Sequence, residues 1–160
     1  INSDSAEYYI SFAKNGNAYF GSARSGGFGS QDIYVSRFQD GKYSQPENLG
    51  AEINSAESEH DPLIFPEEDF LIFKSENRKD GFGEADLYVS KRTPKNKWSV
   101  AANLGSRFNT PTWEYCPYLT PDGKFFFYSS EYDIKWVQTQ SLKNILLLFN
   151  FQMTQNDCNI

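Results

Sequence analysis

The feature that most constrains the fold is an internal repeat of about 54 residues. Residues 27–36 read GFGSQDIYVS, and residues 81–90 read GFGEADLYVS. Two shorter segments recur at nearly the same interval: NLG at 48–50 and 103–105, and EHDP at 59–62, which returns as EYCP at 114–117. A repeat of this length indicates a supersecondary unit that buries its apolar face only by stacking on its copies.

An earlier unit fits the same pattern at a slightly smaller interval. Residues 7–9 match the segments that begin at Glu59 and Glu114, and residues 1–3 match residues 53–55. We therefore expect the chain to open on the tail of a preceding unit, with further residues before it in the parent protein.

Each unit reads as four short strands separated by turns. In the second unit we predict a fourth strand that begins at Trp98, after strands at 60–65, 70–75 and 86–91. The third unit repeats the first two strands and then shortens the third, with strands at 115–120, 125–130 and 133–137. Aromatic residues make up 17% of the chain, and aromatic runs between Gly and Pro turns favour sheet over helix. Four short strands per unit are typical of a β-propeller blade.

The turn TPDGK at 120–124 is followed by an aromatic strand that ends in Ser, and DIYV at 32–35 returns as DLYV at 86–89. These motifs resemble the TolB-like, WD-repeat-like β-propeller family over residues 1–137, although two of the three turns depart from Pro-Asp-Gly. The resemblance implies an all-β fold, a partial β-propeller of about three four-stranded antiparallel blades side by side. We place the blades and the irregular tail that follows at about 4–58, 59–113, 114–137 and 138–160.

The resemblance also implies a location and a role. Members of the family are mostly bacterial and extracytoplasmic, in the periplasm or the cell envelope, and their propellers serve as platforms for protein binding. A protein partner or a cell-envelope glycan is therefore expected. No signal peptide is visible in this chain.

Three blades cannot close a propeller, which has about 4–8 of them. An open array exposes the apolar faces of its terminal blades, so either further residues complete the ring or the chain associates through these open blades with itself or a partner. The tail leaves three interpretations open. The apolar residues Leu142, Ile145, Leu146, Phe149 and Met153 have the spacing of an amphipathic helix, but a buried strand or a tail foreign to the fold are alternatives.

Composition excludes several classes of function. The net charge of −6 disfavours nucleic acid as a partner, and no apolar run is long enough to span a membrane. The single histidine, His60, has no cluster of ligands around it, so no metal or cofactor is expected. Of the two cysteines, Cys116 lies in a predicted strand and is interpreted as a small buried residue.

Carboxylates recur once per unit at Glu7, Glu59 and Glu114, just before the first strand. As a ring around a channel they would bind a cation or a basic group of a peptide. The alternative is structural: each carboxylate accepts backbone N–H bonds and fixes the connection between blades.

The glycine loops 24–30 and 78–84 each present one arginine and one phenylalanine, Arg24 with Phe28 and Arg78 with Phe82. Exposed Phe and Arg are common anchors of interfaces, so these four residues are the candidate binding surface. The alternative is that both rings fold back onto the blade. Asp32 and Asp86, which follow the loops, are expected to accept turn N–H groups rather than to bind calcium.

Catalytic signatures are not recognisable in the sequence, because there is one histidine and no Gly-x-Ser-x-Gly elbow. We therefore expect a module for binding or scaffolding and not an enzyme. The alternative is a gating or substrate-binding propeller of a larger hydrolase, such as a peptidase or glycosidase.

Overall fold

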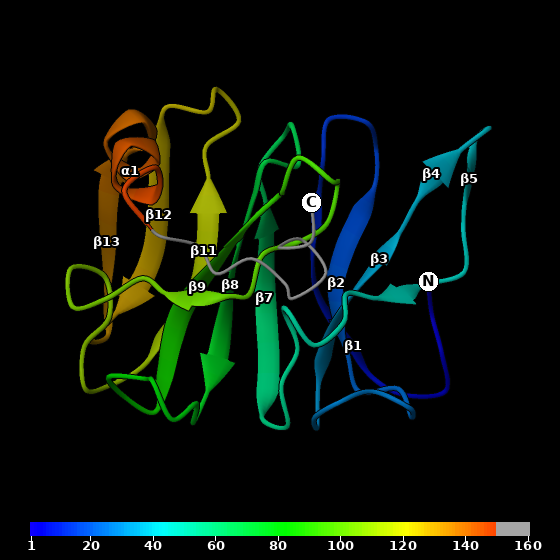
Figure 1. Ribbon diagram of the computed structural model, residues 1–160, viewed down its shortest axis with the longest axis horizontal. Coiled ribbons are helices and arrows are strands. Elements are labelled where there is room, and N and C mark those ends of the chain that lie inside the picture. Colours follow the sequence, from blue (N-terminus) through cyan, green and yellow to red (C-terminus); the bar gives the residue numbers. More distant parts are fainter. Residues whose placement is uncertain (150–160) are drawn as a thin grey trace.

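The computed structural model describes residues 1–149 and is all-β apart from one short helix (Figure 1). Each repeat forms one small antiparallel sheet. In spatial order the first sheet contains β1 (Glu7–Phe12), β2 (Ala18–Ser22), β3 (Asp32–Ser36) and β6 (Glu47–Asn48). The second contains β7 (Ser58–Ile64), β8 (Phe70–Glu76), β9 (Ala85–Lys91) and β10 (Ala102–Asn103). The third contains β11 (Glu114–Leu119), β12 (Phe125–Ser130) and β13 (Asp133–Gln138).

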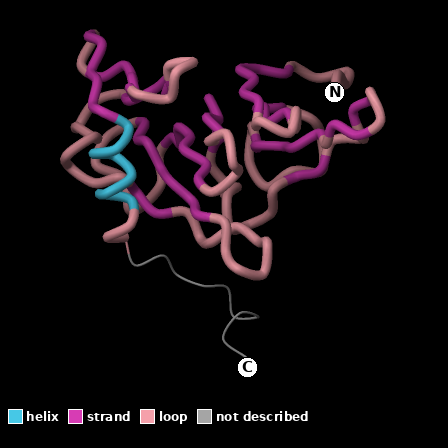
Figure 2. The backbone as a smooth tube through the Cα atoms, turned by 90° about the horizontal axis from the view of Figure 1, so that it is seen from above, coloured by secondary structure: helices cyan, strands magenta, loops and turns pink. Residues whose placement is uncertain are grey.

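Two small elements lie outside these sheets. The strands β4 (Phe38–Gln39) and β5 (Lys42–Tyr43) form a separate hairpin, and α1 (Thr139–Leu146) follows the last strand. Figure 2 shows α1 at the opposite end of the molecule from the N-terminus.

The predicted third strands form with the expected sequences, DIYVS in β3 and ADLYVSK in β9. The predicted start of the fourth strand at Trp98 is wrong, since the regular fourth strand is β10, and Trp98 makes only an isolated bridge with Arg92. Packing explains the difference. The Trp98 ring is buried and meets the Tyr19 ring edge to face at 6.4 Å between centroids, so this residue belongs to the core between the first two sheets.

The three sheets bury their apolar faces on one another. Tyr19, Ile33 and Val35 of the first sheet share a buried cluster with Leu71 and Phe73 of the second. The opposite face of the second sheet forms another cluster with the third sheet, which includes Leu63, Phe70, Ile72, Leu87, Val89, Phe126 and Tyr128. Full burial of one such side chain contributes about 1.5–3 kcal/mol. Stacking therefore supplies the stability that a single small sheet lacks.

Each first strand carries a β-bulge at the same position of the repeat. Tyr9, Asp61 and Cys116 have positive φ angles of 41°, 49° and 51°, and the pairing register shifts beside each of them. A bulge breaks the alternation of inward and outward side chains. For this reason the prediction that Cys116 is buried is wrong: its side chain is exposed.

The helical interpretation of the tail is confirmed over Thr139–Leu146. Leu142 and Leu146 are fully buried in the cluster between the second and third sheets, and Ile145 packs against it. The predicted continuation to Met153 lies outside the described residues. Within those residues no helix has the length and apolar character needed to cross a membrane.

Candidate functional site: a loop face with exposed aromatic rings

The carboxylate of Glu59 lies at the centre of a buried polar network. Its side chain is fully buried, and it accepts bonds from the Ser55 backbone N–H at 2.9 Å and from the Ser75 hydroxyl at 2.8 Å. The Arg78 guanidinium donates to it at 2.9 Å and lies over the Tyr88 ring, 4.6 Å from the centroid. The network ties the linker before β7 to the end of β8.

The other two repeats build related arrangements: Glu7 pairs with Arg24, whereas Glu114 has no arginine among its bonded partners in the described residues. Glu114 is fully buried and accepts bonds from the Thr110 backbone N–H at 2.9 Å and the Ser130 hydroxyl at 2.8 Å. Glu7 accepts a bond from the Ser3 hydroxyl at 2.5 Å, which is the main reason that its pKa is lowered. The contacts are those of the structural interpretation, in which each carboxylate accepts linker N–H groups.

The two predicted arginines point into the protein and not outward. Arg78 and Arg24 pair with Glu59 and Glu7 and stack on rings of their own sheets, and their side chains are only 13% and 18% exposed. The guanidinium charge of each arginine is thereby paired inside its own repeat. The phenylalanines of the same loops behave differently: Phe28 is 51% exposed and Phe82 50%.

The glycine loops are held in place by their own repeat and by the linker to the next. The Phe82 backbone N–H donates to Asp86 at 2.6 Å, and the Phe28 N–H donates to Asp32 at 2.7 Å, which confirms the predicted turn role of both aspartates. A Cβ atom at Gly83 would overlap the carbonyl oxygen of Thr112 in the linker. The loops are therefore fixed supports for the rings that they expose.

Two further aromatic residues extend this surface, which we call the loop face: Phe28, Phe82, Trp113 and Tyr132. Trp113 lies in the linker before β11 and is 42% exposed, and its indole N–H donates to Glu84 of the second glycine loop at 2.5 Å. Tyr132, in the β12–β13 turn, is 99% exposed. Trp113 and Tyr132 also line a hollow of about 330 Å³. In Figure 1 the β8–β9 loop and the β12–β13 turn lie at the same edge of the molecule.

The sequence analysis missed Trp113 and Tyr132 for an identifiable reason. The third repeat has no glycine loop, so it offers no phenylalanine equivalent to Phe28 or Phe82. The available signal was the position of Tyr132 in a turn between two strands, where an aromatic side chain has no sheet to pack on.

His60 lies in β7, the first strand of the second sheet, beside Ser58 and Glu76. Its Nε2 atom is 2.9 Å from the Ser58 hydroxyl and 3.5 Å from the Glu76 carboxylate. Burial lowers the His60 pKa, and the Lys74 ammonium lowers it further. A Ser–His–acid relay uses both ring nitrogens, whereas here one nitrogen meets both partners, so the cluster does not have the geometry of a catalytic triad.

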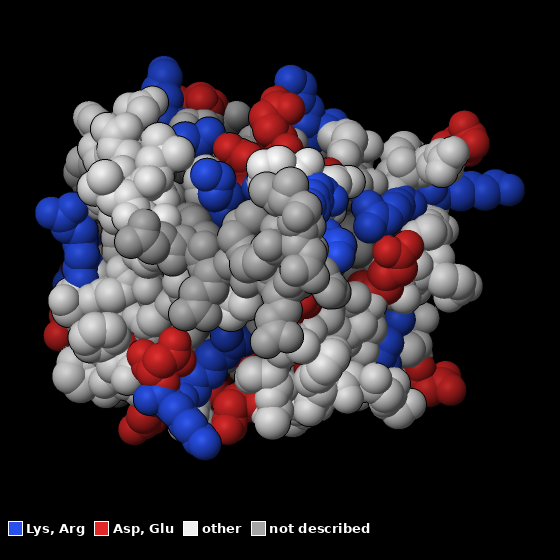
Figure 3. Space-filling model, in the orientation of Figure 1, with Lys and Arg blue, Asp and Glu red and all other residues white. Residues whose placement is uncertain are grey.

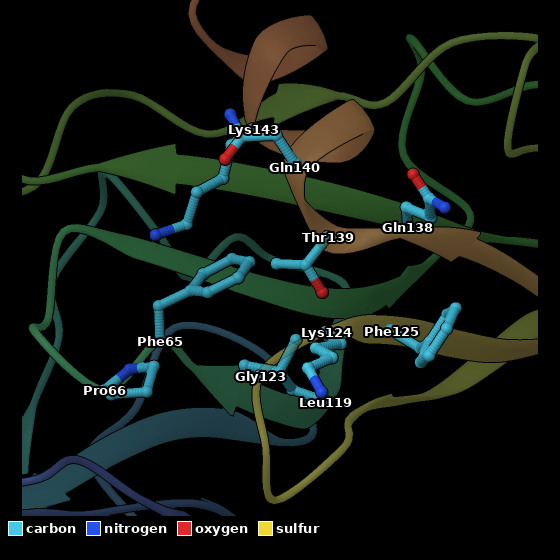
Figure 4. A pocket seen from close by; sticks show the side chains of 10 residues that line it. All are labelled: Phe65, Pro66, Leu119, Gly123, Lys124, Phe125, Gln138, Thr139, Gln140 and Lys143. Atoms are coloured by element: carbon cyan, nitrogen blue, oxygen red, sulfur yellow. The ribbon is translucent and has the colours of Figure 1, made fainter.

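A cavity of about 460 Å³ lies between the β7–β8 turn, the β11–β12 turn and the start of α1 (Figure 4). In Figure 1 these turns lie at the edge opposite the loop face. Its walls combine the apolar side chains of Phe65, Leu119 and Phe125 with the ammonium groups of Lys124 and Lys143. Lys143 lies over the Phe65 ring and 3.8 Å from Asp69. None of the predicted site residues lines this cavity.

Charged side chains do not gather into one patch on the face that Figure 3 presents, where acidic and basic groups are interspersed. Among residues 1–149 no group of three or more His, Cys, Asp or Glu side chains is placed to hold a metal ion. The fold and the loop face together define an all-β repeat protein with exposed aromatic rings on one edge. No family model, no curated protein and no solved structure matches the chain.

Proposed function

We propose that the chain is a run of about three β-propeller blades of the TolB-like kind and acts as a non-catalytic binding module of the bacterial cell envelope. The repeat motifs, the three stacked antiparallel sheets and the four-strand order of the first two support the propeller assignment. The envelope location rests on the resemblance of those motifs alone.

The observation that carries the binding role is the exposure of aromatic rings on rigid loops. Phe28 and Phe82 are each about half exposed although the loops beneath them are fixed by Asp32 and Asp86. Large rings that are ordered before binding lose little conformational entropy when they are buried against a partner. Aromatic residues are also enriched among the residues that dominate the energy of protein interfaces.

A protein partner fits this surface better than a glycan does. Sugar hydroxyls need convergent polar groups, yet the arginines beside both phenylalanines already donate to Glu7 and Glu59 inside the repeats. The loop face therefore offers mainly apolar contact, as the core of a protein interface does.

Photo-crosslinking tests this function. Benzoylphenylalanine at position 28 or 82 is expected to give discrete adducts with envelope proteins, whereas the same probe at Tyr43 of the separate hairpin, 40% exposed, gives none. In a pull-down of the crosslinked protein with the unlabelled chain, replacing both phenylalanines by alanine is expected to abolish binding. The melting temperature should stay unchanged, because half-exposed rings contribute little to the core.

Three results would count against the proposal. Equal labelling from position 43 would show non-specific contact, and a fall in melting temperature that parallels the loss of capture would place the rings in the core. Retention on purified peptidoglycan without any protein adduct would identify a glycan as the ligand instead.

A further inference from the structure

The outer face of the third sheet is apolar at each position where the second sheet buries a core residue. The pairing registers align Ile72 and Val89 of the second sheet with Phe127 and Trp136 of the third. The five buried side chains Leu63, Phe70, Ile72, Leu87 and Val89 correspond in this way to Tyr118, Phe125, Phe127, Ile134 and Trp136. The third sheet thus repeats the surface that the second sheet uses to bind its neighbour.

This outer face has no neighbouring sheet among residues 1–149. Ile134 is 66% exposed, Trp136 57% and Tyr118 49%. The Trp136 ring packs on Phe125 and Phe127 with centroids 5.5 and 6.4 Å away. The remaining outward residues of the cross-strand rows are Tyr115, Ser129 and Gln138, so no position on the face carries a charge. An apolar face of this kind marks an interaction site.

The two interfaces inside the chain show which surface fits such a face. Between the first two sheets, the face of the first sheet that contains Tyr19 packs against the face of the second sheet that contains Phe73. Between the second and third sheets, the face that contains Ile72, the equivalent of Tyr19, packs against the face that contains Tyr128, the equivalent of Phe73. The outer face of the third sheet therefore requires a face of the Phe73 kind.

Within the described residues one face of the Phe73 kind lacks a neighbouring sheet, and it belongs to the first sheet. Phe20 is the equivalent of Phe73, and Phe12 the equivalent of Ile64. Phe20 itself is 1% exposed and lies under the Arg24 guanidinium. The free part of this face is therefore Phe12, 54% exposed, and Ile10 on the same strand, 45% exposed. The chain carries the two complementary halves of one interface at its opposite ends.

We propose that the outer face of the third sheet binds the outer face of the first sheet of a second copy of this chain, head to tail. The contact continues the stacking that the chain uses internally. It adjoins the loop face at Tyr115 but uses none of the rings Phe28, Phe82, Trp113 and Tyr132, so it is tested separately from the proposed binding function. Because the two surfaces differ, each added copy presents a new free end, and association extends or closes into a ring.

Paired variants test the polarity of the contact. Trp136→Glu removes one half of the interface and Phe12→Glu the other, so each variant alone is expected to be monomeric by light scattering. Mixed in equal amounts, the two variants retain one intact interface and should form a dimer and nothing larger. The wild-type mass should rise between about 1 and 100 µM, the range expected for an interface of modest size.

The control is Tyr43→Glu, which adds the same charge at an exposed site on the separate hairpin and should associate like the wild type. Ile134→Glu serves as a second variant of the third sheet if Trp136→Glu lowers the far-ultraviolet dichroism. A wild-type chain that stays monomeric over this range would overturn the proposal. So would self-association of either single variant, which indicates a symmetric contact, or a mixture that fails to dimerise.

Discussion

Replacing Arg78 by methionine should destabilise the protein far more than the same change at Arg24. Both arginines pair with the carboxylate of their own repeat, but Glu59 is fully buried, whereas the Glu7 side chain is 18% exposed. Arg78→Met leaves the buried carboxylate with only neutral donors. Removing one partner of a buried ion pair costs about 3–5 kcal/mol, whereas a partly exposed pair is worth about 1 kcal/mol or less.

The lower end of the first range is expected for Arg78→Met. Glu114 is equally buried and is held by the Thr110 and Ser130 groups, with no arginine among its bonded partners. The serine donors that remain around Glu59 therefore stabilise the lone charge in part. We expect a loss of about 3 kcal/mol for Arg78→Met and about 1 kcal/mol for Arg24→Met.

Urea unfolding followed by circular dichroism measures both values, and thermal unfolding gives a second estimate at about 2–4 °C per kcal/mol for a domain of this size. Losses that agree within about 0.5 kcal/mol, inside the usual spread of such measurements, would refute the argument that burial of the carboxylate sets the cost.

Three other changes test further parts of the structure. His60 binds a proton less readily in the folded state than in the unfolded one, so stability should fall as pH drops below about 6.5, and His60→Gln should remove this dependence; an unchanged pH profile would contradict it. Leu142→Ala, at a fully buried position of α1, should lower the free energy of unfolding by about 2–5 kcal/mol. Leu148→Ala, at an 81% exposed position, should lower it by under about 0.5 kcal/mol, and similar losses would mean that α1 does not pack on the sheets. Gly83→Ala should destabilise by about 1–3 kcal/mol through its overlap with the linker. The loss should exceed that of Gly21→Ala, whose Cβ would meet no atom closer than 3.5 Å, and equal melting temperatures would exclude the close contact at Gly83.

The repeat made most of the sheet structure predictable. The strands β8, β9 and β12 match their predicted ranges within one residue at each end, because turn residues and alternating apolar residues both specify them. The fourth strand was predicted less well. Tryptophan is common in strands, but the ring of Trp98 packs in the core between two sheets and its backbone does not join a regular strand. This packing depends on Tyr19, which is distant in sequence.

The candidate site was predictable in part. The exposure of Phe28 and Phe82 follows from their position in glycine loops, but the inward direction of Arg24 and Arg78 does not. An arginine four residues before a phenylalanine is compatible with either direction, and the choice depends on a carboxylate in the first strand of the same repeat. The exposure of Cys116 likewise depends on a β-bulge that cannot be predicted from the local sequence.

The stacking of the repeats is tested most directly by distances between aromatic rings of neighbouring repeats. Nuclear Overhauser spectroscopy should show contacts between Tyr19 and Trp98, whose centroids lie 6.4 Å apart, and between Phe108 and Phe126, at 6.3 Å. Both contacts together are the result expected if each sheet packs on the next copy. Well-resolved rings with neither contact, or with Tyr19 adjacent to Phe126, would contradict it.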